Sequence, residues 1–182
     1  MVEKATLAQA RNGEQMTIWP VNPSWLPNSC QVSQKLWRGA KPTMSGLDVL
    51  SAPHSIIYGG FKTIIDLEAW FDFNPLEWLA VKRAGMTYKS LPCSPWHPEI
   101  EDVAAFLKIV TDPAQQPVFV HCRRGIDRTG MMCAIYRIVV QGWTKNDAIA
   151  EMTQGGFGWN NDWPEIIPFI RGLDIEQLRS IR

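Results

Sequence analysis

The chain has 182 residues, of which 46% are apolar and 20% charged, and these values are typical of one globular domain with a single hydrophobic core. Its 18 basic and 18 acidic side chains balance, so it lacks the basic excess of a protein that coats duplex nucleic acid. Four cysteines without a C-x-x-C pair and three histidines without zinc-site spacing indicate free thiols in a reducing compartment and no bound metal.

The N-terminal segment carries no pattern of a regular element. It is polar at first and then rich in proline and tryptophan between Trp19 and Pro27, which predicts an extended arm. The residues after Met1 lack the apolar stretch of a signal peptide, and no run is long and apolar enough to span a bilayer. We therefore expect a cytoplasmic protein; removal of a presequence would instead indicate the periplasm. Residues 1–30 are assigned to the arm and residues 31–182 to one domain.

The first part of this domain alternates β and α signals. Gln31–Arg38 predicts a short strand or a hairpin, and the β-branched run Phe61–Leu67 predicts a strand. Between them, residues 45–60 are ambiguous because Pro53 interrupts a weak helical pattern.

A helix and another strand follow. Asn74 can cap this helix, Pro75 suits its first turn, and Gly85 ends it. Residues 86–91 predict a strand, and the proline-rich residues 92–98 predict a loop.

The second half begins with an amphipathic helix over Pro98–Val110, whose first turn is acidic. The apolar run Pro117–Val120 predicts a central parallel strand that is covered on both faces. Thr129–Gln141 is apolar nearly all round and predicts a buried helix. A helix over Thr144–Met152 and one or two short helices from Trp163 complete the chain. This order of elements indicates one α/β domain.

The stretch HCRRGIDRTG, from His121 to Gly130, joins the central strand to the buried helix. Backbone N–H groups at the start of a helix lack partners within the helix and therefore form an anion site. Gly125 allows the turn that lets these amides converge. Cys122 lies at the mouth of the site, where the amides, the helix dipole and Arg128 favour its thiolate at neutral pH.

Arg128 and Thr129 complete the chemistry that this loop can perform. The planar guanidinium of Arg128 can hold two phosphate oxygens, and it holds them best when they become equatorial in an in-line displacement. The Thr129 hydroxyl can form a hydrogen bond to the sulfur and help it to leave when water attacks.

The same stretch resembles the signature H-C-x5-R-[ST]-G of the protein tyrosine and dual-specificity phosphatase superfamily. The matching positions are His121, Cys122, Gly125, Arg128, Thr129 and Gly130. The resemblance implies a three-layer sandwich with a central, mostly parallel sheet flanked by helices. It also implies hydrolysis of phosphate monoesters (EC 3.1.3) through a phosphocysteine on Cys122, with Arg128 as phosphate clamp, His121 as a brace of the loop, and no metal or organic cofactor.

Weaker similarity to the same superfamily extends over most of the chain. Leu36–Pro42 is similar to a segment of small bacterial members, and Gln154–Phe157 stands where dual-specificity enzymes often have a Gly-Phe turn near the active site.

The sequence departs from the superfamily pattern at the general acid, which is usually an aspartate on a loop before the nucleophile. Pro95 or Trp96 stands at that place. Asp127 is one candidate, because it resembles the acid of bacterial lipid and tyrosine phosphatases whose loop ends Asp-Arg-Thr-Gly; alternatively it braces Arg128 or a neighbouring amide. The possible acid loop includes Trp96, His97 and Glu99. The other acid candidates lie on or just after this loop, where a solvated position at a helix start is the favoured interpretation of each: His97, Glu99, Glu101 and Asp102.

The expected partner is a phosphorylated protein or an inositol phosphate or phosphoinositide. The residues expected to bind phosphate are Arg123, Arg124, Gly125, Ile126, Asp127 and Arg128. The arginine pair favours a polyanionic inositol phosphate, whereas Trp96 offers an aromatic wall for a phosphotyrosyl ring, unless it only packs at the rim. We favour phosphotyrosine-like substrates in a shallow pocket, and the simplest expectation is a monomer.

Three alternatives remain open at this point. The missing loop aspartate suits a phosphate-binding module without turnover, and a reactive cysteine on an anion loop also occurs in sulfur-transfer and arsenate-reducing enzymes. Among the other thiols, Cys133 should only pack in its helix and Cys30 has no assigned role, while Cys93 could act as a resolving thiol for Cys122.

Overall fold

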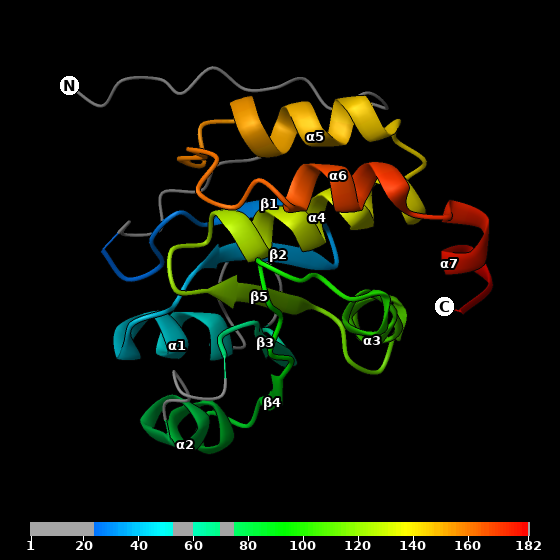
Figure 1. The fold of residues 1–182 in the computed structure, drawn as a ribbon. Coiled ribbons are helices and arrows are strands. Elements are labelled where there is room, and N and C mark those ends of the chain that lie inside the picture. Colours follow the sequence, from blue (N-terminus) through cyan, green and yellow to red (C-terminus); the bar gives the residue numbers. More distant parts are fainter. Residues whose placement is uncertain (1–23, 53–59, 70–74, 182) are drawn as a thin grey trace.

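The computed structural model describes residues 24–52, 60–69 and 75–181, and Figure 1 shows the fold. The interpretations of the arm up to residue 23, of Pro53 and of an Asn74 cap lie outside these residues. Residues 24–29 of the expected arm lie against the domain, where Leu26 is buried and Asn28 contacts other segments.

A five-stranded sheet forms the middle of the molecule. Its strands are β1 (Cys30–Ser33), β2 (Leu36–Ala40), β3 (Thr63–Asp66), β4 (Thr87–Ser90) and β5 (Val118–Cys122). They are ordered β1-β2-β5-β3-β4, and only β1 runs antiparallel to its neighbour. The mostly parallel sheet is therefore confirmed, and β5 is its central strand.

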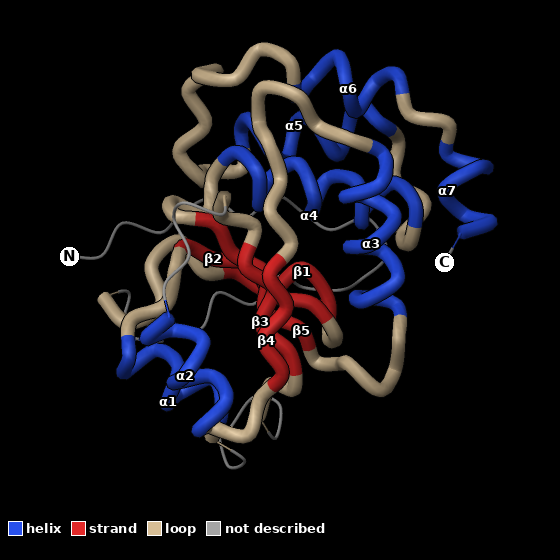
Figure 2. The backbone as a smooth tube through the Cα atoms, turned by 60° about the horizontal axis from the view of Figure 1, so that its bottom comes forward, coloured by secondary structure: helices blue, strands red, loops and turns tan. Residues whose placement is uncertain are grey.

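Helices cover both faces of this sheet, as Figures 1 and 2 show: α1 and α2 on one face and the others on the opposite one. The helices are α1 (Met44–Ser51), α2 (Pro75–Arg83), α3 (Ile100–Thr111), α4 (Asp127–Val139), α5 (Lys145–Gln154), α6 (Ile166–Gly172) and α7 (Ile175–Ile181). The alternation of side chains along β5 divides them between two cores. Val118 and Val120 pack in the core with α3–α7, whereas Phe119 packs in the core with α1 and α2.

The boundaries of several elements differ from the expectations. Residues 45–60 were ambiguous, and the structure places α1 at Met44–Ser51, with the Thr43 side chain accepting a hydrogen bond from the Gly46 amide. The expected helix start at Thr129 was two residues late, because Asp127 and Arg128 already form the first turn of α4. Thr144 caps α5 as predicted, and two short helices follow Trp163.

The carboxyl ends of the parallel strands meet at one edge of the sheet. Ala40 on β2 pairs with Cys122 on β5, and Asp66 on β3 pairs with His121. The loops that follow these three strands therefore lie side by side, which is where ligands bind in open α/β sheets. None of the helices within the described ranges is long and apolar enough to cross a membrane.

Candidate active site

The loop of residues 123–126 connects the central strand β5 to the buried helix α4. Its tight turn depends on Gly125, which has a φ of 68°. A Cβ atom at this position would lie 2.4 Å from both the carbonyl carbon of Gly39 and the amide nitrogen of Ala40. The loop therefore lies in direct backbone contact with the end of β2.

Hydrogen bonds from two residues draw the loop carbonyls away from its interior. The backbone amide of Lys41 donates to the Arg123 carbonyl at 3.5 Å. The Asn28 Nδ2 atom donates to the carbonyls of Arg124 and Gly125, at 3.1 and 3.3 Å. In a trans peptide the carbonyl and the following N–H point in opposite directions. The N–H groups of residues 124–126 consequently face the other way, as an anion cradle requires.

Arg38, on the neighbouring strand β2, also holds this loop in place. Its guanidinium is buried, donates to the Gly125 carbonyl at 2.7 Å and lies 3.7 Å above the centre of the Phe157 ring. The Phe157 carbonyl accepts from Asn28 at 3.0 Å. The sequence pointed to the segments around Arg38 and Phe157 only through resemblance, and it gave no sign of Asn28.

A pocket of about 390 Å³ opens at this loop. Its lining consists of Cys122, Arg123, Arg124, Asp127, Arg128 and Trp163. Cys122 lines the pocket although it is only 3% exposed. Arg128 donates from Nη1 to the Leu67 carbonyl at 3.1 Å, which fixes its guanidinium beside the cysteine. The structure thus brings the expected nucleophile and phosphate clamp together.

Asp127 lies in the same pocket, but its carboxylate contacts Arg124 and not Arg128. The distance from Asp127 Oδ2 to Arg124 Nη2 is 3.3 Å, and the same guanidinium nitrogen donates to Asp162 at 3.1 Å. In the alternative in which Asp127 has a bracing role, the residue that it contacts is therefore Arg124. The other oxygen of Asp127, Oδ1, is buried without a hydrogen-bond partner among the described residues.

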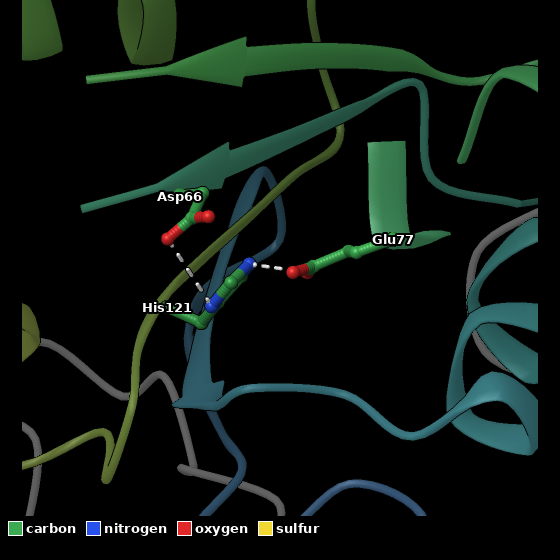
Figure 3. Close-up of side chains that lie close together, drawn as sticks. All are labelled: Asp66, Glu77 and His121. Atoms are coloured by element: carbon green, nitrogen blue, oxygen red, sulfur yellow. Dashed lines mark ion pairs between the residues drawn. The ribbon is translucent and has the colours of Figure 1, made fainter. Parts of the chain in front are cut away.

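Thr129 and His121 flank the pocket without lining it. The Thr129 hydroxyl is buried and has no hydrogen-bond partner within the described part of the chain. His121 precedes Cys122 on β5, so its side chain points to the opposite face of the sheet, where Nε2 lies 2.9 Å from Glu77 and Nδ1 lies 3.9 Å from Asp66 (Figure 3). Burial alone would lower the pKa of His121, but the carboxylates of Glu77, Asp66 and Glu68 raise it.

The aromatic side chain that lines the pocket is Trp163, which the sequence analysis missed. Trp96, the expected aromatic wall, is 55% exposed and packs edge-to-face on Trp163, with ring centres 4.3 Å apart. Trp96 therefore packs at the rim of the pocket, which was the alternative to its role as an aromatic wall. No sequence pattern distinguished Trp163 from the other tryptophans, because its place depends on how the segment between α5 and α6 folds back.

The structure does not bring the other acid candidates into the pocket lining. His97 donates its amide to the Ser94 hydroxyl, and Glu99 precedes the first turn of α3. Glu101 and Asp102 lie in that first turn. Burial, and then the neighbouring Glu99 and Glu101, raise the pKa of Asp102. Of the candidates, Asp127 is the one that lines the pocket.

The remaining thiols are free and buried. Burial raises the pKa of Cys93 to about 12, with a further contribution from Asp102. Burial also raises the pKa of Cys30 and of Cys133 to about 11. These three side chains therefore remain thiols at neutral pH, and Cys122 is the cysteine that lines the pocket.

Comparison of the sequence with protein families gives a match over residues 24–159 to a family described as "DSP-PTPase phosphatase fused to NAD+ Kinase". The dual specificity protein phosphatase TpbA of Pseudomonas aeruginosa is 31% identical over 173 residues, which cover 90% of this chain and 73% of TpbA. The inositol diphosphatase DSP3 of Arabidopsis thaliana is 32% identical over 75 residues, or 41% of this chain and 35% of DSP3.

Solved structures show the same similarity. The crystal structure of P. aeruginosa TpbA has a TM-score of 0.73 and 29% identity, and the match covers 94% of this chain and 98% of the crystallised TpbA chain. A second TpbA structure, in complex with pTyr, has the same TM-score and identity over 94% and 97% of the two chains. The core catalytic domain of the PP-IP phosphatase SIW14 from S. cerevisiae shares the fold, with a TM-score of 0.72 and 22% identity over 86% and 91% of the chains.

Proposed function

The chain belongs to the dual-specificity family of cysteine-dependent phosphatases, and on this basis we propose that it hydrolyses phosphotyrosine-type esters with Cys122, Arg128 and Asp127 as its reacting and binding groups. The observation that supports these assignments is the pocket in which the three side chains meet at the start of α4.

In the first step, the Cys122 thiolate attacks phosphorus and a sulfur–phosphorus bond forms while the ester oxygen leaves. The loop N–H groups and the Arg128 guanidinium bind the three non-bridging oxygens, which carry the charge of the transition state. Asp127 donates a proton to the leaving oxygen from Oδ1, the oxygen that Arg124 does not contact.

In the second step, water attacks the phosphocysteine, the sulfur–phosphorus bond breaks, and inorganic phosphate is released. Asp127 accepts a proton from this water, in the reverse of its first role. The Thr129 hydroxyl, buried beside the loop, stabilises the departing thiolate. Arg128 and the amides stay in place through both steps, so neither step requires the site to reorganise.

The pocket wall favours an aromatic ester over a polyphosphorylated inositol. Trp163 presents an apolar surface next to the phosphate cradle, where the ring of a phosphotyrosine can pack. The Arg124 guanidinium is already paired with Asp127 and Asp162, so little of its positive charge is available to additional phosphates. TpbA, whose structure in complex with pTyr is known, supports the same substrate class.

Phosphate release from a phosphotyrosine peptide, an aryl phosphate, phosphoinositides and inositol polyphosphates tests this proposal. We expect the phosphotyrosine peptide to have the highest kcat/KM, chelators to have no effect, and Cys122→Ser to abolish release. Trp163→Ala should raise KM for the peptide about tenfold, while Trp78→Ala, an exposed tryptophan of α2, should not. Preference for an inositol polyphosphate would overturn the substrate assignment, and turnover by Cys122→Ser would overturn the role of the cysteine.

The four free cysteines also lead us to propose a location in a reducing compartment, the cytoplasm. We further propose that the protein acts as a monomer. Fractionation of cells and light scattering of the purified protein test these two proposals, and a dimer at working concentration would contradict the second.

A further inference from the structure

A cluster of buried charged side chains lies behind the pocket, on the other face of the sheet. Its acidic members Asp66, Glu68 and Glu77 are each at most 4% exposed, and His121 is fully buried among them. The cation Lys41, which follows β2, closes the cluster. Figure 3 shows the central triad, in which the His121 ring lies between Asp66 and Glu77. We call these five residues the His121 cluster.

The triad of Asp66, Glu77 and His121 has the composition of a metal site, with ligand atoms within 4.8 Å of one another. Its geometry favours a proton over a metal. The carboxylates lie near different nitrogens of the ring, with Glu77 2.9 Å from Nε2 and Asp66 3.9 Å from Nδ1, so that negative charge on both sides favours a charged ring. Lys41 Nζ lies 2.5 Å from Glu68 and 3.3 Å from Glu77, so its ammonium group already provides these carboxylates with the positive charge that a metal ion would provide.

Charge balance in the cluster depends on the protonation of His121. With a neutral ring, three buried carboxylates face a single ammonium; with an imidazolium, one further charge is compensated. Tyr88 on β4 does not add a charge, because its hydroxyl donates to Asp66 at 2.6 Å and burial raises its pKa. The raised pKa of His121 agrees with the charged form.

We propose that Lys41 and Glu77 are positioning residues that set the charge of His121 and thereby the affinity of the pocket for an oxyanion. The inference rests on the proposed function only in taking the pocket at Cys122 as the phosphate site.

Two connections join the cluster to that site. His121 is followed directly by Cys122, so the charged ring and the thiol that lines the pocket belong to adjacent residues of β5. Lys41 also holds the Arg123 carbonyl through its backbone amide. If the imidazolium loses its proton, the net charge of the cluster becomes one unit more negative and repels a bound anion more strongly. The charged groups that face the ring come from three elements: Asp66 and Glu68 at the end of β3, Glu77 on α2, and Lys41 after β2.

Sulfate binding to Cys122→Ser protein between pH 5 and 10 tests the proposal, because neither sulfate nor the serine titrates in this range. NMR of the His121 ring in the same protein gives the pH at which it loses its proton. We expect sulfate affinity to fall about tenfold as the ring deprotonates. Adding Glu77→Gln should lower the midpoint of the His121 titration by about one pH unit or more, and the pH at which sulfate affinity falls should move down with it.

Adding Lys41→Met should have the opposite effects on both quantities. It removes a cation, so the midpoint of His121 should rise, and the fall in sulfate affinity should move to the same higher pH. Lys41→Arg, which keeps the charge, should keep the wild-type midpoint. Glu151→Gln breaks a different buried ion pair, with Arg137, and should change neither quantity.

The opposite signs separate this proposal from simple damage to the fold, which would weaken binding in every variant. Equal midpoints for Glu77→Gln and Lys41→Met would overturn it, as would sulfate affinity that does not follow the titration of His121. Hydrolysis by Cys122→Ser would overturn the proposed function but leave these binding measurements valid, so the two failures are distinguishable.

Discussion

The guanidinium of Arg38 donates to the carbonyl oxygen of Gly125 at 2.7 Å, across 87 residues of sequence. Arg38 stands on β2 and Gly125 in the loop after β5, so the bond ties the site loop to a neighbouring strand. Phe157 covers one face of the guanidinium. Because the bond is buried and its donor is charged, it contributes more than an ordinary hydrogen bond to holding the loop.

Replacing Arg38 by methionine keeps most of its volume and removes the donor. We expect kcat/KM to fall about 10- to 100-fold, the equivalent of about 1.5–3 kcal/mol for a lost bond to a charged group. Steady-state kinetics with an aryl phosphate measures this loss. Arg83→Met, at an exposed position of α2, is the matched control and should keep full activity. Full activity of Arg38→Met would show that the loop holds its shape without this support.

Gly125→Ala should remove anion binding and lower stability. The new Cβ would meet the backbone of Gly39 and Ala40 at 2.4 Å, and neither group can move without breaking the pairing of β2 with β5. We expect a loss of at least about 3 kcal/mol in the free energy of unfolding. Denaturant unfolding and calorimetric titration with sulfate measure the two effects.

Gly85→Ala is the control for the backbone conformation alone. Gly85 also has a positive φ, 77°, but a Cβ atom at this position would have no atom of the described residues within 4 Å beyond its chain neighbours. The variant should lose only about 1 kcal/mol and bind sulfate normally. Equal losses in the two variants would mean that backbone strain, and not the contact with β2, decides the cost at Gly125.

Iodoacetamide should label Cys122 first in the folded protein at pH 7.5. Burial raises the pKa of Cys93 to about 12 and that of Cys30 and Cys133 to about 11, so these thiols ionise only at strongly alkaline pH. Peptide mass spectrometry identifies the labelled residues, and unfolded protein should label at all four cysteines. Labelling of Cys93 at neutral pH would restore it as a resolving thiol.

The strand, loop and helix of the site could be predicted from sequence because their signals are local. The apolar run before Cys122, the glycine in the loop and the apolar helix after it occupy one continuous stretch. The reactive residues lie in that stretch, so their types and spacing already indicated phosphate chemistry.

The supports of the site could not be predicted, because they come from distant segments. Asn28 and Arg38 contact the loop across 97 and 87 residues, and Glu77 meets His121 only after α2 has packed against the sheet. Trp163 reaches the pocket while Trp96 stays at the rim, and nothing local distinguishes these two tryptophans. Such contacts depend on tertiary packing and produce no periodic pattern in the sequence.

The sequence left more alternatives for the general acid than for any other role. The dependence of kcat on the leaving group of the substrate tests Asp127 directly. An alkyl or tyrosyl oxygen needs a proton to leave, whereas para-nitrophenolate leaves readily without one. We expect Asp127→Asn to lower kcat about 100-fold or more for a phosphotyrosine peptide and far less for para-nitrophenyl phosphate.

Asp162→Asn is the matched control, because Asp162 contacts the same Arg124 nitrogen from outside the pocket. If Asp127 serves only to hold Arg124, both variants should have the same small effect on both substrates. If Asp127 is the acid, only Asp127→Asn should lower activity much more for the phosphotyrosine peptide than for para-nitrophenyl phosphate. An equal loss on the two substrates would exclude Asp127 as the general acid and leave the residues of the loop before α3 as the candidates.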